Sequence, residues 1–299
     1  MNKFNVVLVR PPHPKFTHLN AYSDVMESLV YALKEIGFDC TSSENTLNPT
    51  RTNIIFGWET AFRYREDFAK NGTVETMFPA DTILFCLEQY AGINVPEGHR
   101  LWRAAKTYQI WDFSELNIET WKKISPKFEV FHCKLGYSPV LEKLSDTSTQ
   151  DFDATFIGRI DDYRCDVIKT AYQSTAQTYI GLNTFSNLWG RTRDEIIGRS
   201  KLMLSISLPE TSFETVRVSY YLNNKKAVLA VVDPKTHIDQ SFRKLVLTCS
   251  TDQFRPHLDM LITNDSFRKG YAEYAYSEFK KFDFRENVYQ FFKPSFLRA

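Results

Sequence analysis

The sequence has few of the features that mark secreted, zinc-binding or membrane-spanning proteins. It holds only five cysteines in 299 residues, scattered along the chain and without a CxxC pair. Such a set does not resemble a disulfide framework or a zinc site, and it suits a reducing compartment. No uninterrupted apolar stretch reaches about 18 residues, and the apolar run near the N-terminus is too short for a signal peptide. We therefore expect a cytoplasmic protein with no membrane span.

A surplus of one charge sign is also missing. The chain has 37 Lys and Arg residues against 36 Asp and Glu residues, a net charge of +1. A dedicated nucleic-acid-binding protein usually carries a basic excess, so the charge of the whole chain argues against one. A local basic face stays open, because residues 191–201 and 217–226 hold several Arg and Lys with few acids.

Four common catalytic or nucleotide-binding motifs do not occur: the Walker loop, GxGxxG, HExxH and GxSxG. Their absence removes support from nucleotidase, dehydrogenase, zinc-protease and hydrolase interpretations. What is present is an ordinary globular composition, with 43% hydrophobic and 24% charged residues. At about 100–200 residues per domain, the length predicts two domains.

Short apolar runs alternate with helical patterns through the first half of the chain. The run FNVVLV at 4–9 is stopped by prolines, and a helical pattern that starts near Ser23 ends at Gly37. Further apolar runs that predict strands lie at 53–57, 82–87, 108–111 and 130–133. This alternation indicates a Rossmann-like unit with a mostly parallel sheet.

The same pattern restarts after a polar stretch, LSDTSTQD at 144–151, which we interpret as a linker. Predicted strands follow at 154–157, 202–206 and 227–232, and a helical segment at 266–292. The predicted fold is therefore α/β, with two Rossmann-like domains at 1–145 and 152–299 facing each other across a cleft. Ligands of such sheets bind beyond the carboxyl ends of the strands.

The run at 193–232 carries a resemblance to a known family. Its segments IGRSKLMLSIS and FETVRVSYYLNNKKAVLA resemble the donor-binding half of GT-B glycosyltransferases, closest to the CgeB-like bacterial branch. NIIFGWE, LFCLEQY and YQIWDFSELNI in the first half, and the glycine turn in FIGRIDDYR, are similar to the same branch. The F-x-T-x-R-V pattern of FETVRV is also similar, more weakly, to phage DNA β-glucosyltransferases.

The resemblance implies a glycosyltransferase that moves a sugar from a nucleotide-sugar donor to a hydroxyl acceptor, a glycan or surface polysaccharide. It implies no cofactor and no metal ion, since GT-B donors are usually neutralised by Arg, Lys and helix N-termini. It also implies that the last helix crosses back to the first domain. Two alternatives stay open: modification of hydroxymethylated bases in phage DNA, and a non-catalytic nucleotide- or glycan-binding module. Tyr220 favours the latter, because many GT-B enzymes have a ribose-binding glutamate there.

The predicted donor site combines a glycine with charged side chains. Gly158, with the amides of the following helix start, can approach a pyrophosphate, and Arg159 and Arg164 can supply countercharge. Glu214 and Arg217 share a helix face, where they can hold a hydroxyl and a phosphate. The alternatives are a turn glycine without a ligand and a helical surface pair.

Two further cations and three acceptor-side groups complete the candidates. Arg199 and Lys201, just before a strand, can form a cationic rim or be solvated. The catalytic candidates follow the ends of first-domain strands: Glu88, His13 and Asp112. Inverting transfer needs a general base near the attacking hydroxyl. His13 is alternatively an ordinary loop histidine, and Asp112 and Ser114 are alternatively helix-capping residues.

Overall fold

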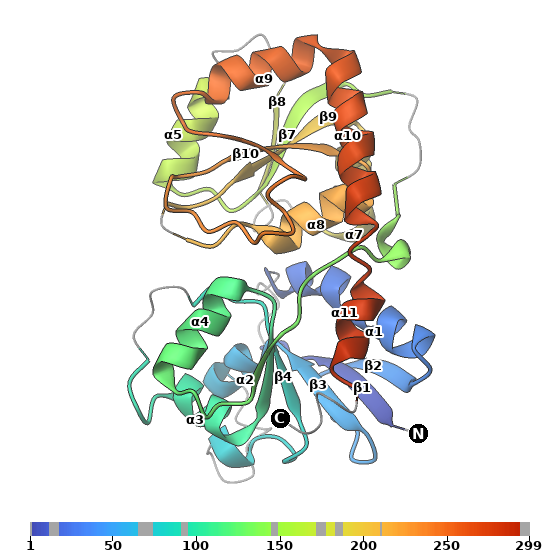
Figure 1. Ribbon diagram of the computed structural model, residues 1–299, viewed down its shortest axis with the longest axis vertical. Coiled ribbons are helices and arrows are strands. Elements are labelled where there is room, and N and C mark those ends of the chain that lie inside the picture. Colours follow the sequence, from blue (N-terminus) through green and yellow to red (C-terminus); the bar gives the residue numbers. More distant parts are fainter. Residues whose placement is uncertain are drawn as a thin grey trace. The chain divides into compact units, whose positions relative to one another are not determined.

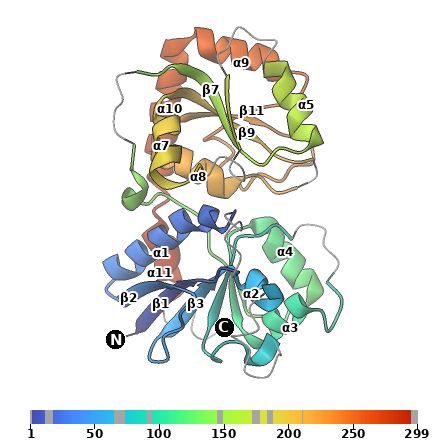
Figure 2. The ribbon, with the colours of Figure 1, turned by 180° about the vertical axis from the view of Figure 1, so that it is seen from behind.

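The computed structural model describes residues 2–11, 18–64, 74–90, 95–144, 149–171, 178–182, 188–209 and 211–293. The chain forms two compact units, residues 1–135 with 284–299, and residues 136–283 (Figures 1 and 2). This division differs from the predicted 1–145 and 152–299, because the polar stretch taken as a linker lies inside the second unit. In the described part of the chain, no helix is long and apolar enough to cross a membrane.

The first unit is built on a parallel six-stranded sheet in the order β2-β1-β3-β4-β5-β6. The strands are β1 (Lys3–Leu8), β2 (Asp39–Glu44), β3 (Thr52–Phe56), β4 (Ile83–Cys86), β5 (Gln109–Asp112) and β6 (Val130–His132). The five predicted strands of this half correspond to β1, β3, β4, β5 and β6. Strand β2, with the polar sequence DCTSSE, lies at the sheet edge and was not predicted.

Helices cover both faces of this sheet (Figure 1). On one face α1 (Ser23–Glu35) packs against α11 (Phe284–Gln290). On the other, α2 (Trp58–Tyr64), α3 (Arg100–Thr107) and α4 (Glu115–Ile124) enclose a core with the alternate strand residues. Helix α1 ends as predicted: Gly37 adopts a left-handed φ of 95°, and the amide of Phe38 donates to Leu33 O at 3.0 Å.

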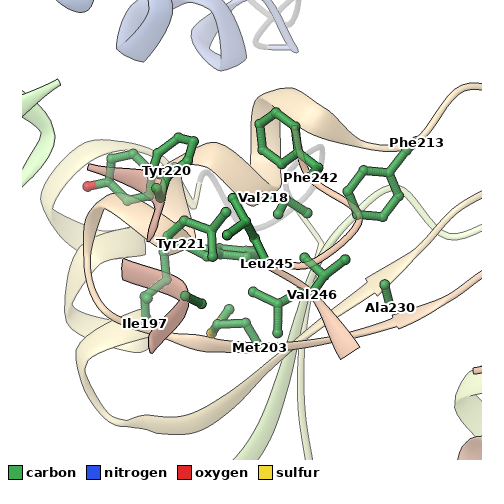
Figure 3. Packing of buried hydrophobic residues seen from close by; sticks show 14 of the residues in the cluster. Ile197, Met203, Phe213, Val218, Tyr220, Tyr221, Ala230, Phe242, Leu245 and Val246 are labelled. Atoms are coloured by element: carbon green, nitrogen blue, oxygen red, sulfur yellow. The ribbon is translucent and has the colours of Figure 1, made fainter. Parts of the chain in front are cut away.

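The second unit repeats the plan with a parallel sheet in the order β11-β10-β9-β7-β8. The strands are β7 (Phe152–Gly158), β8 (Thr178–Leu182), β9 (Ser200–Ile206), β10 (Ala227–Val231) and β11 (Leu247–Cys249). Helices α5 (Asp162–Ala171) and α9 (Phe254–Thr263) cover one face. Helices α7 (Gly190–Gly198), α8 (Thr215–Asn223) and α10 (Asp265–Phe279) cover the other. Figure 3 shows this second core, where Val218 and Tyr221 of α8 pack over Met203 of β9 and Ala230 of β10.

The strand order of both sheets contains a reversal. The first strand of each unit lies between the second and the third. The chain therefore adds its second strand on one side of the first strand and its third strand on the other side. In the second unit this point lies between β7 and β9, which are direct neighbours. Open α/β sheets bind ligands at the carboxyl ends of the strands beside such a reversal.

The segment that enters the second unit is fastened to the C-terminal end of α8. Asn223 Oδ1 accepts from the amide of Ser138 at 2.9 Å. Asn224 Oδ1 accepts from the amides of Lys143 and Leu144, at 2.9 and 3.0 Å. These bonds explain why the boundary falls before residue 136 rather than in the polar stretch. The predicted helical segment at 266–292 is likewise interrupted, with α10 in the second unit and α11 in the first.

Candidate functional site

The candidate site lies at the carboxyl ends of β7 and β9, beside the reversal in the second sheet. Gly158 ends β7, Ile206 ends β9, and α8 begins at Thr215. Three of the predicted donor residues, Arg164, Glu214 and Arg217, meet at this edge through direct contacts. The structure thus brings these three predicted residues together, and their role in donor binding stays a prediction.

Arg217 reaches from α8 across the end of β7. Its guanidinium carbon lies 5.5 Å from the ring centroid of Phe156. A Cβ on Gly158 would meet Arg217 Nη2 at 3.0 Å, closer than side chains normally tolerate. Gly158 thus gives room to a guanidinium group, which neither the pyrophosphate interpretation nor the turn-glycine alternative predicted.

Arg164, from α5, is anchored by hydrogen bonds within the protein. Its Nε donates to Ile206 O at 2.9 Å and its Nη2 donates to Glu214 Oε1 at 2.6 Å. Its Nη1 lies 3.3 Å from Asp161 Oδ2, and the residue is only 6% exposed. Arg164 therefore organises the site from within, and its donors are already engaged.

One amide at the start of α5 is already engaged by a side chain. The side chain of Asp161 accepts from the amide of Arg164 at 2.9 Å, as an N-capping carboxylate does. Asp162 adds a second acid in the first turn. The amide of Arg164 is therefore not available to a pyrophosphate, and the two acids add negative charge at this helix start, while Arg159 at the same turn is exposed.

The predicted cationic rim of Arg199 and Lys201 requires a correction. Both residues lie at the amino end of β9, the opposite edge of the sheet from Gly158. Arg199 forms an ion pair with Asp151, and Lys201 Nζ pairs with Asp153 Oδ1 at 2.6 Å. Since a strand of seven residues spans roughly 23 Å, these cations cannot serve the same site as Arg217.

Three polar atoms at this edge are buried without a hydrogen-bond partner among the described residues. They are Arg217 Nη1, Ser205 Oγ and Ser207 Oγ. Ser205 lies in β9 and Ser207 directly follows it, and both are fully buried. A buried donor without an acceptor is costly, and a charged donor more so. The serines were not predicted, although two hydroxyl residues at the end of the apolar run LMLSIS are the available signal.

Carboxyl groups gather at the carboxyl edge of the first sheet. Glu59 follows β3 and Glu88 follows β4. Tyr90 donates to Glu59 Oε1 at 2.7 Å, and Tyr22 donates to Glu88 Oε1. Burial, and then the charge of Glu88, raises the pKa of Glu59 to about 8. Glu88 is the exposed member of the group, whereas Tyr22 and Tyr90 are buried. A reachable carboxylate beside a protonated one is an arrangement typical of functional sites.

Asp112 has a different environment from the one predicted for a catalytic base. It is fully buried, and its oxygens accept from the amide of Ser114, the side-chain amide of Asn117 and the indole of Trp121, at 3.0 Å each. Ser114 in turn caps α4 by accepting from the amide of Asn117. Burial raises the pKa of Asp112 to about 6. These contacts fit the capping alternative, because no oxygen of Asp112 faces solvent.

Of the two remaining predicted features, only Tyr220 can be placed, because His13 lies outside the described residues. Tyr220, which the resemblance to GT-B enzymes places at the position of a ribose-binding glutamate, is buried and donates to Asp194 Oδ1 at 2.6 Å. The guanidinium of Arg193 lies 3.8 Å from the centre of its ring. Tyr220 is thus held by α7 and makes a structural contact.

No protein-family model and no curated protein matches this sequence. The fold, in contrast, is similar to solved glycosyltransferases. HepE of Anabaena, solved with UDP and glucose, has a TM-score of 0.59 at 10% identity over 96% of this chain and 97% of that one. WaaG, a glycosyltransferase of lipopolysaccharide biosynthesis, has a TM-score of 0.59 at 10% identity, over 95% of this chain and 98% of that one. The DNA-modifying enzyme β-glucosyltransferase, studied with and without uridine diphosphoglucose, has 0.50 at 10% identity over 96% of each chain.

These similarities confirm the predicted fold class, an α/β protein with two Rossmann-like domains of the GT-B type. At 10% identity these similarities show the fold and do not show the activity. The CgeB-like branch stays a prediction.

Proposed function

We propose that this protein transfers a sugar from a nucleoside diphosphate sugar to a hydroxyl acceptor. The observation that carries the proposal is Arg217 Nη1, a buried cationic donor without a described partner, beside Gly158 at the reversal of the second sheet. A guanidinium group matches phosphate oxygens in geometry and charge. The GT-B fold of the solved relatives makes the diphosphate of a sugar nucleotide the substrate class that fits best.

In the proposed reaction, the acceptor hydroxyl attacks the anomeric carbon of the donor sugar and the bond to the diphosphate breaks. Arg217 stabilises the negative charge that develops on the departing diphosphate. Glu88, the exposed carboxylate held by Tyr22, takes the proton of the attacking hydroxyl. The products are the glycosylated acceptor and a nucleoside diphosphate.

We propose that guanidinium groups, and no metal ion, neutralise the donor. The acids at this edge support this, since Glu214 and Asp161 are both engaged by Arg164. Transfer should then persist in excess EDTA. Loss of transfer on chelation, restored by a divalent cation, would contradict this part of the proposal.

A glycan or surface polysaccharide is the acceptor that we favour. The alternative, hydroxymethylated DNA, draws on the similarity to β-glucosyltransferase, but the net charge of +1 offers no excess for a phosphate backbone. An acceptor panel that contains both polysaccharide and hydroxymethylated DNA separates the two possibilities. Transfer only to DNA would overturn our choice of acceptor and leave the donor site intact.

A thermal-shift screen with nucleoside diphosphates and nucleotide sugars tests the proposal first. A ligand at about 100 times its dissociation constant adds roughly 2.7 kcal/mol to the free energy of unfolding. The shift should be lost in Arg217→Gln and kept in Arg255→Gln, an exposed arginine on α9. The absence of a shift with every nucleotide would contradict the donor site, and a shift without transfer would favour the non-catalytic binding module.

A further inference from the structure

The carboxylate of Glu214 lies between two arginines. It occupies the N-cap position of α8 but makes no capping hydrogen bond there. Instead Oε1 accepts from Arg164 Nη2 at 2.6 Å, and Oε2 lies 3.5 Å from Arg217 Nη2. Its side chain is 21% exposed. Both oxygens are therefore directed at guanidinium groups.

The two arginines differ in how many donors remain. Arg164 is bonded through Nε, Nη1 and Nη2, and its side chain is 7% exposed. Arg217 has a 20% exposed side chain and keeps Nη1 without an acceptor in the described part of the chain. Glu214 thus links the guanidinium group of Arg164, which is fixed by hydrogen bonds, to that of Arg217, whose Nη1 has no acceptor among the described residues.

The charges of this cluster cancel. Arg164 and Arg217 contribute two positive charges, and Glu214 and Asp161, which are both in contact with Arg164, contribute two negative ones. A phosphate at this place would be recognised by a directed hydrogen bond more than by surplus positive charge. The orientation of the Arg217 guanidinium then decides how well the phosphate binds.

We infer that Glu214 is a positioning residue, which holds Arg217 against Arg164 so that its free Nη1 meets the diphosphate of the donor. This inference rests on the proposed donor site and changes the predicted role of Glu214, which was contact with the ligand. It has a counterintuitive consequence. Replacing Glu214 by glutamine makes the cluster more positive by one charge, yet it weakens the binding of a phosphate because the geometry is lost.

Calorimetric titration with UDP, UMP and inorganic pyrophosphate tests the inference. In Glu214→Gln we expect the affinity for UDP and pyrophosphate to fall about tenfold, the value of one charge-assisted hydrogen bond. UMP, which lacks the second phosphate, should lose much less. Glu195→Gln is the matched control, since Glu195 forms an exposed i,i+4 pair with Arg191 on α7.

A double substitution separates positioning from a general structural effect. If Glu214 acts through Arg217, Glu214→Gln adds no further loss in the Arg217→Gln background. The inference is overturned if Glu214→Gln binds UDP as tightly as the unchanged protein, if UDP and UMP weaken by the same factor, or if the two losses add. An unchanged protein that binds none of the three probes overturns the donor site as well. Binding without sugar transfer overturns the proposed function alone.

Discussion

The guanidinium group of Arg217 lies directly over Gly158, and a Cβ at that glycine would come within 3.0 Å of Nη2 and 3.2 Å of Cζ. The same Cβ would also meet Phe156 Cζ at 3.0 Å, so two neighbours would have to move. The glycine therefore adjoins two packed side chains, and its backbone conformation does not itself call for glycine. Its replacement offers a direct test of whether Arg217 serves the donor.

In Gly158→Ala we expect nucleotide affinity to fall by a few-fold, because the guanidinium group of Arg217 has to give way by a few tenths of an ångström. The free energy of unfolding should fall by about 1–3 kcal/mol, as overpacking does. Titration calorimetry and urea unfolding measure the two effects. Gly270→Ala on α10 is the control: nothing lies within 4 Å of its Cβ, so the protein should gain roughly 0.5–1 kcal/mol and bind nucleotide normally. Unchanged affinity in Gly158→Ala together with unchanged affinity in Arg217→Gln would remove Arg217 from the site.

Glu88→Gln should separate chemistry from donor binding. We expect sugar transfer to fall by about 10²–10⁴-fold, since an amide cannot accept the proton of the acceptor hydroxyl. Nucleotide affinity should not change, because Arg217 and its partners lie in the other unit. Steady-state transfer assays and titration on the same preparations measure both. Glu97→Gln, an exposed glutamate farther along the same connection, should behave like the unchanged protein. Full activity in Glu88→Gln would exclude Glu88 as the base.

Glu59 should give the protein a pH-dependent stability. Its pKa is raised from 4.5 to about 8, so between these values the folded state holds a proton that the unfolded state releases. The stabilisation is complete below about pH 4.5 and is lost as the pH rises through about 8. Urea unfolding at several pH values should show this decline, and Glu59→Gln should flatten it.

Asp112 and Glu88 also affect the pH dependence of stability. Asp112, whose pKa is raised from 3.8 to about 6, contributes a similar decline at lower pH in both proteins. Glu88→Gln should lower the pKa of Glu59, because the charge of Glu88 is the second largest cause of its shift. A stability curve with the same slope in the unchanged protein and in Glu59→Gln would show that Glu59 is ionised in the folded state.

Asp112→Asn should destabilise the fold without affecting the donor site. An amide in this buried place presents a donor where Asn117 and Trp121 already donate, which leaves a group unsatisfied at a cost of about 1–3 kcal/mol. Chemical denaturation should show the loss, and nucleotide binding at low temperature should be normal. Unaltered stability would mean that the hydrogen bonds of Asp112 are not formed in solution.

The buried parts of the fold were the predictable ones. Apolar runs such as 4–9 and 202–206 predicted strands that are covered on both faces, since a parallel sheet buries every side chain. Strand β2 escaped prediction because its polar sequence pairs only with β1 at an edge. The boundary between the two units was not predicted at residue 136 for another reason. The segment 136–144 is held by the side chains of Asn223 and Asn224, about 80 residues away in sequence.

The site was predictable where its residues follow a strand end or share a helix face. Gly158, Glu214 and Arg217 satisfied these conditions and do lie together. Arg199 and Lys201 are also close to Glu214 and Arg217 in sequence. They lie at the start of β9, however, so the length of that strand separates them from the edge where Arg217 lies. The ion pair between Arg164 and Glu214 joins residues 50 positions apart, which no local pattern reveals.

The return of α11 to the first unit has a consequence for biosynthesis. Phe291 packs on Trp111 with ring centroids 4.6 Å apart, and Phe292 lies 4.6 Å from Phe38, so residues from both ends of the chain complete one core. On the ribosome, the first 135 residues emerge long before these aromatic rings exist. The second unit, continuous in sequence, can fold while the first still awaits its final helix. We expect newly made chains to expose the apolar surface of α1 and β5 that α11 and Phe291 cover, until residue 292 has left the ribosome, and to need protection from aggregation during that interval.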